Sequence, residues 1–321
     1  MTDFTTSVLI PSFGRPAALK NCLFSLAAQT RKPEEVIVVW QADDTPTRDA
    51  AEQIGQALPY NLRLIHHPIP GIVPAENQGL AVATGQIIVL IDDDAVAPPE
   101  WIADHLACYS DRRVGAVGGP AVNFYPDGTP FPKRAAEPVG KLTWYGRAYG
   151  NLYDHVEHWA SRSPLEADGL VGYNMSLRRE AFDRFEERLL PYWQLFELDA
   201  CLQVKGRGYR VIVDFVNAVQ HYPTNTAYVA GRHGDLAVKV YNAAYNYSFI
   251  LAKHSPWYLR APRLLYLLAV GSVNSPGLAS FFVAVRRYGS PLREAKILLG
   301  TWQHLLAGWQ AGRRAARSVA R

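Results

Sequence analysis

The chain has 321 residues, of which 49% are hydrophobic and 19% are charged, and this composition excludes a disordered protein. Its length suits two structural units, or one α/β domain with additions. The three cysteines, Cys22, Cys108 and Cys201, are too few and too widely spaced for a disulfide framework or a zinc cluster. We therefore expect a reducing compartment, and the polar first residues predict no secretion signal.

The formal net charge of +4 is unevenly distributed along the chain. From Arg286 onward there are eight basic residues and one acidic residue, a net charge of +7, which leaves −3 for the rest. This distribution argues against a protein that coats nucleic acid, and we expect no nucleic-acid partner. The basic end instead favours contact with a membrane surface or with another protein.

The first 115 residues alternate between short apolar segments and segments with helical spacing. The apolar segments are predicted strands at 7–10, 36–40, 62–65 and 87–91, and the helices between them are predicted at 17–29, 45–58 and 75–83. Strands that are apolar throughout indicate a mostly parallel sheet with helices on both faces. In such sheets ligands bind beyond the carboxyl ends of the strands, here at 11–15, 41–44 and 92–94.

The pattern becomes irregular after residue 118. A strand-like segment at 169–177, helices at 180–185 and 195–205, and a strand at 209–215 are predicted there. From about residue 230 no strand pattern remains, and the chain is predicted to form helices broken at Pro256, Pro262 and Pro276. We therefore divide the chain into three segments: 1–115, 116–229 and a helical segment, 230–321.

Asp92, Asp93 and Asp94 follow directly after the predicted strand 87–91. Three adjacent carboxylates repel one another, and hard divalent cations such as Mg²⁺ or Mn²⁺ offset that repulsion. The alternative is a solvated acidic turn, which the position at the ligand-binding edge of the sheet makes less favourable. These residues are therefore the first candidates for a metal site.

A second acidic pair, Glu197 and Asp199, begins the predicted helix 195–205. One of the two carboxylates can act as a general base that takes a proton from an acceptor hydroxyl. The alternative is stabilisation of the helix N-terminus by its dipole. His221 follows the predicted strand 209–215 and is either a structural residue or a nitrogen ligand to the same metal.

These motifs occur in the order that is typical of one enzyme family. The sequence resembles the family 2 glycosyltransferases, which have the GT-A fold, a Rossmann-like, mostly parallel α/β sheet with flanking helices. The matching segments are 8–16, 36–44, 71–79, 83–94, 172–179 and 196–199, together with His221. The resemblance implies a nucleoside diphosphate sugar donor, Mg²⁺ or Mn²⁺ as the metal, and inversion at the anomeric carbon.

The resemblance also implies roles for individual residues. Asp92 and Asp94 match the outer positions of the D-x-D motif, with Asp94 as the metal ligand and Asp92 facing the donor. The other matches are Glu197 as catalytic base with Asp199 as its alternative, His221 at the metal or diphosphate, Pro11, Ser12, Arg15, Asn77 and Asp93 at the donor, and Tyr173 and Asn174 at the acceptor. Trp193 is a further candidate for the acceptor, because it lies near the proposed base in the sequence. By this resemblance the segment 1–115 would bind the nucleotide sugar, and 116–229 would hold the acceptor and the base.

Three positions depart from the family pattern: Trp40 replaces an Asp, Glu76 replaces an Arg, and Phe196 replaces a Glu. Asp43 or Asp44 is expected to contact the nucleobase in place of Trp40, which either stacks on the base or packs in the core. UDP is the expected nucleotide, with dTDP and GDP as alternatives. The alternative function is a nucleotide-sugar-binding scaffold subunit without turnover.

The segment 264–285 is apolar but interrupted by Gly, Ser, Asn and Pro, so it makes a poor transmembrane span. Arginines at the ends of the predicted helices suit an element that lies in a membrane interface. The expected enzyme is cytoplasmic, is peripheral on the inner face of the cell membrane, and builds glycans or cell-surface polysaccharide on a saccharide or lipid-linked acceptor. The alternative for the C-terminal helices is a cap on the catalytic domain or a homo-oligomer interface.

Overall fold

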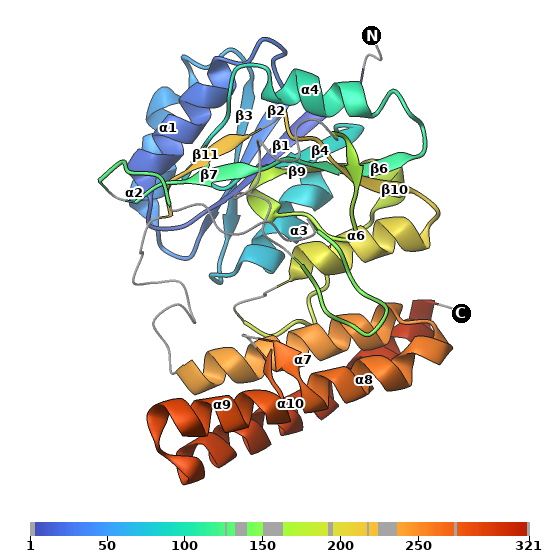
Figure 1. The fold of residues 1–321 in the computed structure, drawn as a ribbon. Coiled ribbons are helices and arrows are strands. Elements are labelled where there is room, and N and C mark those ends of the chain that lie inside the picture. The colour runs from blue at the N-terminus through green and yellow to red at the C-terminus, as the bar shows by residue number, and fades with distance from the viewer. Residues whose placement is uncertain are drawn as a thin grey trace. The chain divides into compact units, whose positions relative to one another are not determined.

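The computed structural model describes residues 4–125, 127–131, 140–149, 163–191, 195–216, 218–223, 236–272 and 275–319. The chain forms two compact units (Figure 1). The first unit comprises Met1–Lys141, Tyr149–Phe185 and Ala200–Thr226, and the second comprises Leu142–Ala148, Glu186–Asp199 and Ala227–Arg321. Each unit is described by itself below.

The first unit is built on an eight-stranded sheet in the order β3-β2-β1-β4-β9-β6-β10-β8. Its strands are β1 (Thr6–Ser12), β2 (Glu35–Gln41), β3 (Asn61–His67), β4 (Ile87–Leu90), β6 (Val114–Gly118), β8 (Leu165–Glu166), β9 (Met175–Arg178) and β10 (Arg210–Val213). Strands β1 to β4 are parallel, whereas β9 runs antiparallel to both β4 and β6. The carboxyl ends of β1, β2, β3 and β4 therefore meet at one edge of the sheet.

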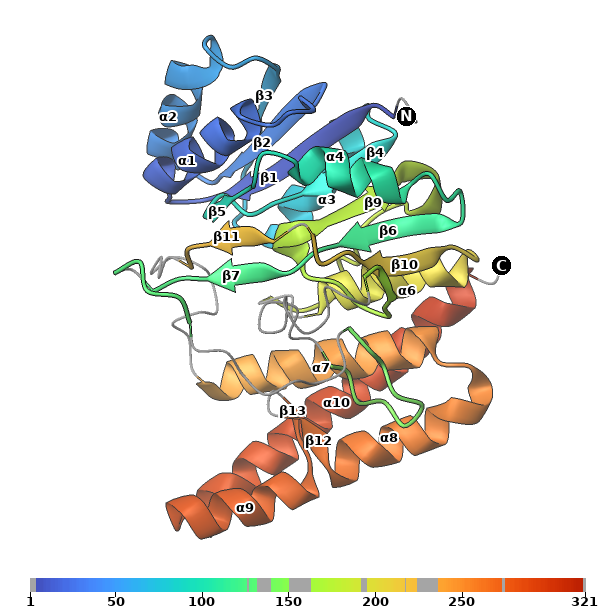
Figure 2. The same ribbon diagram turned by 45° about the horizontal axis from the view of Figure 1, so that its top comes forward.

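Helices cover both faces of this sheet (Figures 1 and 2). They are α1 (Pro16–Ala27), α2 (Thr45–Gly55), α3 (Ile72–Val82), α4 (Trp101–Cys108) and α6 (Phe196–Gly206). Alternate residues of a strand point to opposite faces. Val8 and Ile10 of β1 share a buried cluster with Leu19 and Leu23 of α1, whereas Leu9 lies against Gly79 of α3. Each buried Leu or Ile stabilises the fold by about 1.5–3 kcal/mol.

Most elements predicted for the first unit are confirmed within two or three residues at their ends. There are two exceptions. The predicted strand 169–177 begins only at Met175, after a 3₁₀ turn over Gly172–Asn174. Where the helix 180–185 was predicted, the chain makes a 3₁₀ turn over Arg179–Ala181. Phe182 and Phe185 are buried there, and the segment is too short to continue a helix beyond that turn. The sequence reasoning also missed α4, whose eight residues follow the two prolines Pro98 and Pro99.

The second unit contains four helices, α7 (Leu236–His254), α8 (Arg260–Ala269), α9 (Leu278–Tyr288) and α10 (Pro291–Val319), among its described residues. A Cβ atom at Gly308 or Gly312 of α10 would overlap backbone carbonyls of α7, so these glycines allow close packing of the two helices. Pro262 does not break a helix as predicted, because it lies in the first turn of α8, where no intrahelical N–H is needed.

Two further observations concern the second unit. Residues Gly271–Ser272 and Ser275–Pro276 form a short antiparallel pair, although no strand was predicted after residue 230. Within the described parts of the chain, none of the helices combines the length and the apolar character that crossing a membrane requires.

Glu35 joins the amino-terminal ends of three neighbouring strands in the first unit. Its carboxylate accepts hydrogen bonds from Ser7 Oγ at 2.6 Å, from Arg63 at 2.8 Å, and from the backbone N and Oγ1 of Thr84 at 2.7 Å. Although burial alone would raise the pKa of Glu35, these donors lower it to about 2. The lowered pKa makes this carboxylate a source of pH-dependent stability.

Replacing Glu35 by Gln is expected to lower the free energy of unfolding by about 3 kcal/mol at pH 7. Because the folded-state pKa is depressed, the contribution of Glu35 is present above pH 4.5 and is lost as the pH falls toward 2. Denaturant titrations between pH 2 and pH 7 measure the difference, with Glu52→Gln, an exposed residue of α2, as the control. Equal differences at both ends of this pH range would contradict the assignment.

Candidate active site

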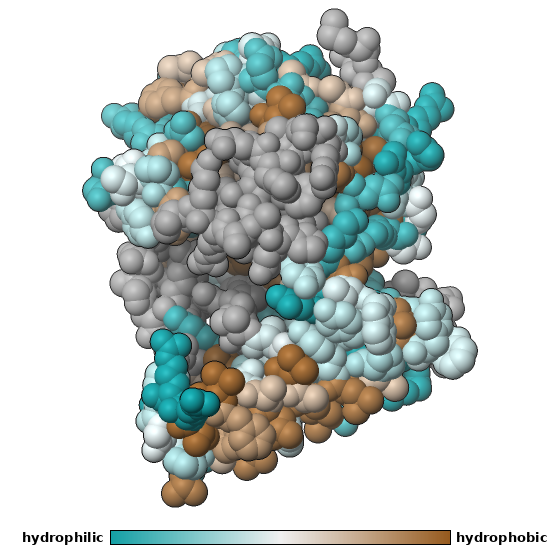
Figure 3. Space-filling view, in the orientation of Figure 1, coloured by the Kyte–Doolittle hydropathy of each residue, from teal (hydrophilic) through white to brown (hydrophobic). Residues whose placement is uncertain are grey.

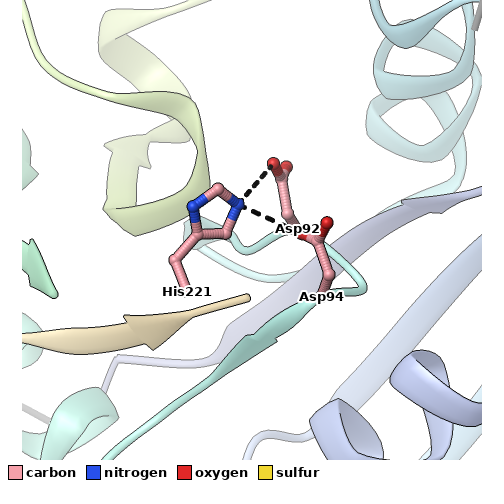
Figure 4. Close-up of side chains that lie close together, drawn as sticks. All are labelled: Asp92, Asp94 and His221. Atoms are coloured by element: carbon pink, nitrogen blue, oxygen red, sulfur yellow. Dashed lines mark ion pairs between the residues drawn. The ribbon is translucent and has the colours of Figure 1, made fainter. Parts of the chain in front are cut away.

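Two short strands bring His221 to the carboxylates that follow β4. After β4, Asp92, Asp93 and Asp94 lead directly into β5 (Ala95–Val96). β5 pairs antiparallel with β11 (Val219–His221), and this register places His221 opposite Ala95. β7 (Ala121–Asn123) continues this three-stranded sheet on the other side of β11. The pairing therefore fixes a residue distant in the sequence beside the acidic triplet (Figure 4).

The imidazole of His221 points at two of the three carboxylates (Figure 4). Its Nε2 lies 3.1 Å from Asp94 Oδ1 and 3.9 Å from Asp92 Oδ2. Its Nδ1 lies 2.6 Å from Asn123 Oδ1, an acceptor, so Nδ1 carries the proton of the neutral ring. Nε2 then presents its lone pair toward the carboxylates, which is the tautomer that a metal-binding histidine needs.

Arg15 and Ser12 compensate the negative charge from the other side. Arg15 contacts Asp93 at 2.9 Å and also hydrogen-bonds to Asp94, while Ser12 Oγ donates to Asp93 at 2.6 Å. Burial, together with the charges of Asp94 and Asp92, raises the pKa of Asp93 to about 7 against the opposing effect of Arg15. Among the described residues, Arg15 is the one guanidinium in contact with this triplet, which has three carboxyl groups.

The structure therefore brings Asp92, Asp94 and His221 together as a candidate metal centre. One ligand atom from each residue can be chosen so that all three lie within 4.8 Å of one another. Adjacent ligands around an octahedral Mg²⁺ are roughly 3 Å apart, so the spacing between Asp94 and His221 fits a hard divalent cation. Two carboxylate oxygens and one imidazole nitrogen also suit Mn²⁺. A cavity of about 540 Å³ reaches Asp94 from the side of α1 and includes Gln220 and Tyr222 in its lining.

A buried polar network holds the segment that stacks on His221. The ring of Tyr173 lies parallel to His221, with centroids 4.3 Å apart. The next residue, Asn174, is fully buried; its Oδ1 accepts from Trp101 at 2.8 Å and from His105 at 3.0 Å, and its amide donates to Pro120 O at 2.8 Å. Burial lowers the pKa of His105 to about 4, so this histidine is neutral near pH 7.

Asn174, expected to contact the acceptor, therefore lies in the interior of the first unit and positions Tyr173. Its side-chain oxygen and nitrogen all have protein partners. The residues that hold it, Trp101 and His105, belong to α4, which sequence reasoning missed. Their spacing of four residues on one helix face is the signal that would have pointed to them.

Other predicted donor-site residues are distributed around the same edge of the sheet. Pro11 lies within β1. Asp44 caps α2 by accepting from the backbone N of Thr47 at 3.3 Å, and it also accepts from the N–H of Gly14. Asp43 is exposed, and it follows Ala42, whose positive φ of 50° is uncommon for a residue with a side chain. The hydrogen bond from Gly14 to Asp44 therefore holds the loop after β2 close to the loop that carries Arg15.

Two further residues discussed in the sequence, Asn77 and Trp40, contact neighbouring residues of the first unit. Asn77 pairs its side-chain amide with the backbone of Phe185, at 3.0 Å and 2.8 Å. Trp40, for which the sequence allowed nucleobase stacking or core packing, stacks on His66 with centroids 4.1 Å apart. Trp193, the third expected acceptor contact, lies outside the described residues.

In the second unit, the two acidic residues at the start of α6 lie in different environments. Glu197 is partly exposed, whereas Asp199 is fully buried. Asp199 accepts from Lys253 Nζ at 2.9 Å and contacts His254 Nε2 at 2.8 Å. Although burial alone would raise the pKa of Asp199, the hydrogen bond from His254 and the charges of His254 and Lys253 hold it below its ordinary value.

Lys253 connects Asp199 to a second carboxylate, because Lys253 Nζ also lies 3.0 Å from Glu186 Oε2. Lys253 is only 7% exposed, and no pattern in the sequence connects it with Asp199, more than 50 residues away. The residue before α6, Leu195, has a φ of 68°, in the left-handed region that Leu rarely adopts. A buried ionic network and a strained turn therefore hold in place the start of α6, which carries Glu197.

Lys253→Ala is expected to lower the free energy of unfolding of the second unit by about 1.5–3 kcal/mol, because it removes a charged hydrogen-bond donor that buried Asp199 and Glu186 share, while His254 and Arg188 stay as their other partners. Lys296→Ala, at an exposed position of α10, is the control and is expected to have little effect. Urea unfolding measures both variants. Indistinguishable unfolding midpoints for the two variants would contradict the structural role of Lys253.

The arrangement of the first unit defines a class of protein: a GT-A glycosyltransferase fold with an acidic cluster at the carboxyl end of β4. The model of the family described as "Glycosyl transferase family 2" matches residues 7–185. This match covers more than half of the chain, and the chain belongs to that family.

Curated relatives agree with this family. The chain is 28% identical over 266 residues to the "O-antigen biosynthesis protein RfbC" of Myxococcus xanthus, covering 78% of this chain and 19% of that protein. It is 25% identical over 224 residues to the "Putative glycosyltransferase EpsH" of Bacillus subtilis, covering 67% and 63%. It is also 26% identical over 174 residues to the "Glucosyl-dolichyl phosphate glucuronosyltransferase" of Haloferax volcanii, covering 53% and 51%. The chain thus spans less than two thirds of the length of these relatives.

Solved structures share the fold. The mannosyltransferase PcManGT from Pyrobaculum calidifontis, in complex with GDP-Man and Mn²⁺, has a TM-score of 0.58 and 19% identity, covering 98% of this chain and 87% of that chain. Residues 1–349 of TarS from S. aureus, in complex with UDP-GlcNAc, have a TM-score of 0.60 and 13% identity, covering 98% and 92%. The predicted α/β fold class and the family resemblance are therefore confirmed.

Proposed function

We propose that the protein transfers a sugar, with inversion, from a nucleoside diphosphate donor to a hydroxyl of a saccharide or lipid-linked saccharide. The observation that carries this proposal is the cluster of Asp92, Asp94 and His221 beside Arg15. Its negative charge and its mixed oxygen and nitrogen donors suit a divalent cation that also binds a diphosphate. The solved structures with a similar fold contain GDP-Man with Mn²⁺ or UDP-GlcNAc, which supports this class of donor.

Mg²⁺ or Mn²⁺ would be held by Asp92, Asp94 and His221, and there it would neutralise charge on a departing diphosphate. Arg15 has two tasks at this edge of the sheet. It holds Asp93 and Asp94 in place, and its guanidinium adds positive potential beside the donor site. Ser12 keeps the buried carboxylate of Asp93 oriented through its 2.6 Å hydrogen bond.

Glu197 is the proposed general base, and Asp199 has a structural role. Asp199 is buried and bound to Lys253 and His254, whereas Glu197 is partly exposed and follows a strained turn at Leu195. Glu197 takes the proton of the acceptor hydroxyl while that oxygen forms a bond to the anomeric carbon. The bond from the anomeric carbon to the diphosphate breaks with its electron pair, which releases the nucleoside diphosphate.

The names of the relatives support the class of acceptor. One is an O-antigen biosynthesis protein, and another is a glucuronosyltransferase of glucosyl-dolichyl phosphate. A growing polysaccharide or a lipid-linked saccharide at the cytoplasmic face of the membrane is therefore the proposed acceptor. UDP is the proposed nucleotide, with GDP or dTDP as the alternatives that the binding experiment below separates.

Asp94→Asn is expected to abolish the stabilisation that a nucleoside diphosphate and Mn²⁺ produce together, because it removes a charged ligand from the cluster. In the wild-type protein, saturating UDP with Mn²⁺ is expected to raise the melting temperature by a few degrees, and either alone to raise it less. Thermal-shift measurements with UDP, GDP and dTDP compare wild type, Asp94→Asn and the exposed control Asp49→Asn. Full Mn²⁺-dependent stabilisation in Asp94→Asn would refute the metal assignment.

Glu197→Gln is expected to reduce transfer or hydrolysis of the nucleotide sugar by about 10²–10⁴-fold, because it removes the general base. Its stabilisation by nucleotide and Mn²⁺ is expected to equal that of wild type. Glu187→Gln, at an exposed position of the same unit, is the matched control for turnover. Nucleotide-sugar binding without turnover in wild type would favour the non-catalytic scaffold and overturn the enzyme proposal.

A further inference from the structure

Exposed apolar side chains are concentrated in the second unit. Of the nineteen large apolar side chains that are exposed among the described residues, eleven lie between Trp257 and Leu306. Figure 3 shows a brown area along the lower edge of the view, where Figure 1 places α9. We define the α8–α9 face by six of these side chains, from α8, α9 and the 3₁₀ turn before α8: Trp257, Tyr258, Leu265, Leu278, Phe282 and Val283. Such a concentration marks an interaction surface.

Helix α9 exposes the side chains that a surface helix normally buries. Leu278, Phe282 and Val283 are 41%, 63% and 67% exposed, and no residue of α9 is buried. Their spacing places them on one side of the helix, and Arg286 and Arg287 extend that side at its last turn. The helix thus turns an apolar stripe with a basic end outward, opposite to the usual arrangement.

Helix α8 also exposes an apolar side chain. Its Leu265 is 64% exposed, whereas Arg263 is 7% exposed and Leu267 is fully buried. The Arg263 guanidinium donates to Ser255 Oγ at 2.8 Å and to Trp144 O at 3.1 Å, so protein groups inside the unit satisfy it. Leu265 therefore adds to the exposed apolar side chains of α9.

The charge around this face selects one kind of partner. Residues 255–321 contain ten Lys or Arg residues and one acidic residue, Glu294. Arg286, Arg287, Arg293 and Lys296 are all exposed on α9 or in the first turns of α10. A second copy of this unit would bring these cations together with few carboxylates to offset them. Anionic lipid headgroups supply the complementary charge, and Trp257 and Tyr258 are the side chains favoured at headgroup depth.

We infer that the α8–α9 face binds the surface of an anionic lipid bilayer, with Phe282 and Val283 inserted among the lipids and Arg286 and Arg287 at the headgroups. The described helices are not suited to span a membrane, so the contact lies in the interface. This inference deepens the proposed function by naming the surface that reaches the membrane. It rests on that function only for the identity of the acceptor that the membrane would carry.

Co-sedimentation of the intact chain with vesicles tests the inference. Vesicles of phosphatidylcholine alone are compared with vesicles containing about 30% phosphatidylglycerol, a fraction chosen to give an anionic surface. The expected result is binding to the anionic vesicles that weakens as salt is added. Absence of binding to anionic vesicles, or equal binding to both compositions, would overturn the inference.

Two variants separate the apolar and the ionic contributions. Phe282→Ser is expected to weaken binding at least tenfold, whereas Phe24→Ser, an exposed Phe of α1 in the first unit, should leave it unchanged. The double variant Arg286→Ala, Arg287→Ala is expected to weaken binding to anionic vesicles roughly 30-fold, at about fivefold per cationic side chain. Because these positions are exposed, both variants should keep the wild-type melting temperature.

Two readouts keep this inference distinct from the proposed function. If the wild-type protein does not bind vesicles but is stabilised by UDP and Mn²⁺, the membrane inference alone is overturned. Vesicle binding without stabilisation or turnover would overturn the transferase proposal alone. If light scattering shows a dimer that Phe282→Ser dissociates, and vesicle binding is unaffected by that variant, a second copy covers the face and the inference is wrong.

Discussion

The structure of the first unit depends on how it accommodates three adjacent carboxylates at the end of a buried strand. Asp93 and Asp94 are almost completely removed from solvent, where an uncompensated charge is expensive. Arg15, from the loop after β1, and His221, from β11, approach the triplet from different elements. A divalent cation bound to these carboxylates would neutralise them and would in turn bind a diphosphate, so the buried acidic groups that cost stability would also provide the proposed chemistry.

Two neighbouring side chains determine the orientation of His221. Asn123 fixes its tautomer, and the stacked ring of Tyr173 fixes its plane. Tyr173 is held in turn by the fully buried Asn174. In the second unit, Lys253 has a comparable supporting task, because it holds the helix start that presents Glu197. Packing and buried polar groups thus set the orientation of the functional side chains.

The sequence was sufficient to predict the strands β1 to β4 and the acidic triplet, because apolar runs and adjacent carboxylates are local patterns. It also identified His221 as a possible ligand through the order of the motifs. It did not predict that Asn174 is buried or that Lys253 pairs with Asp199, since these contacts join residues distant in the chain. Helix propensity could not show that α8 buries Arg263, because only tertiary packing decides which helix face is covered.

The central claim is that Asp92, Asp94 and His221 form one divalent-cation site that serves the nucleotide donor. Anomalous diffraction at the manganese edge, from crystals grown with a nucleoside diphosphate and Mn²⁺, tests it most directly. The account predicts one strong anomalous peak bounded by these three side chains and by the diphosphate. Bound nucleotide with Mn²⁺ located away from the three residues would contradict it.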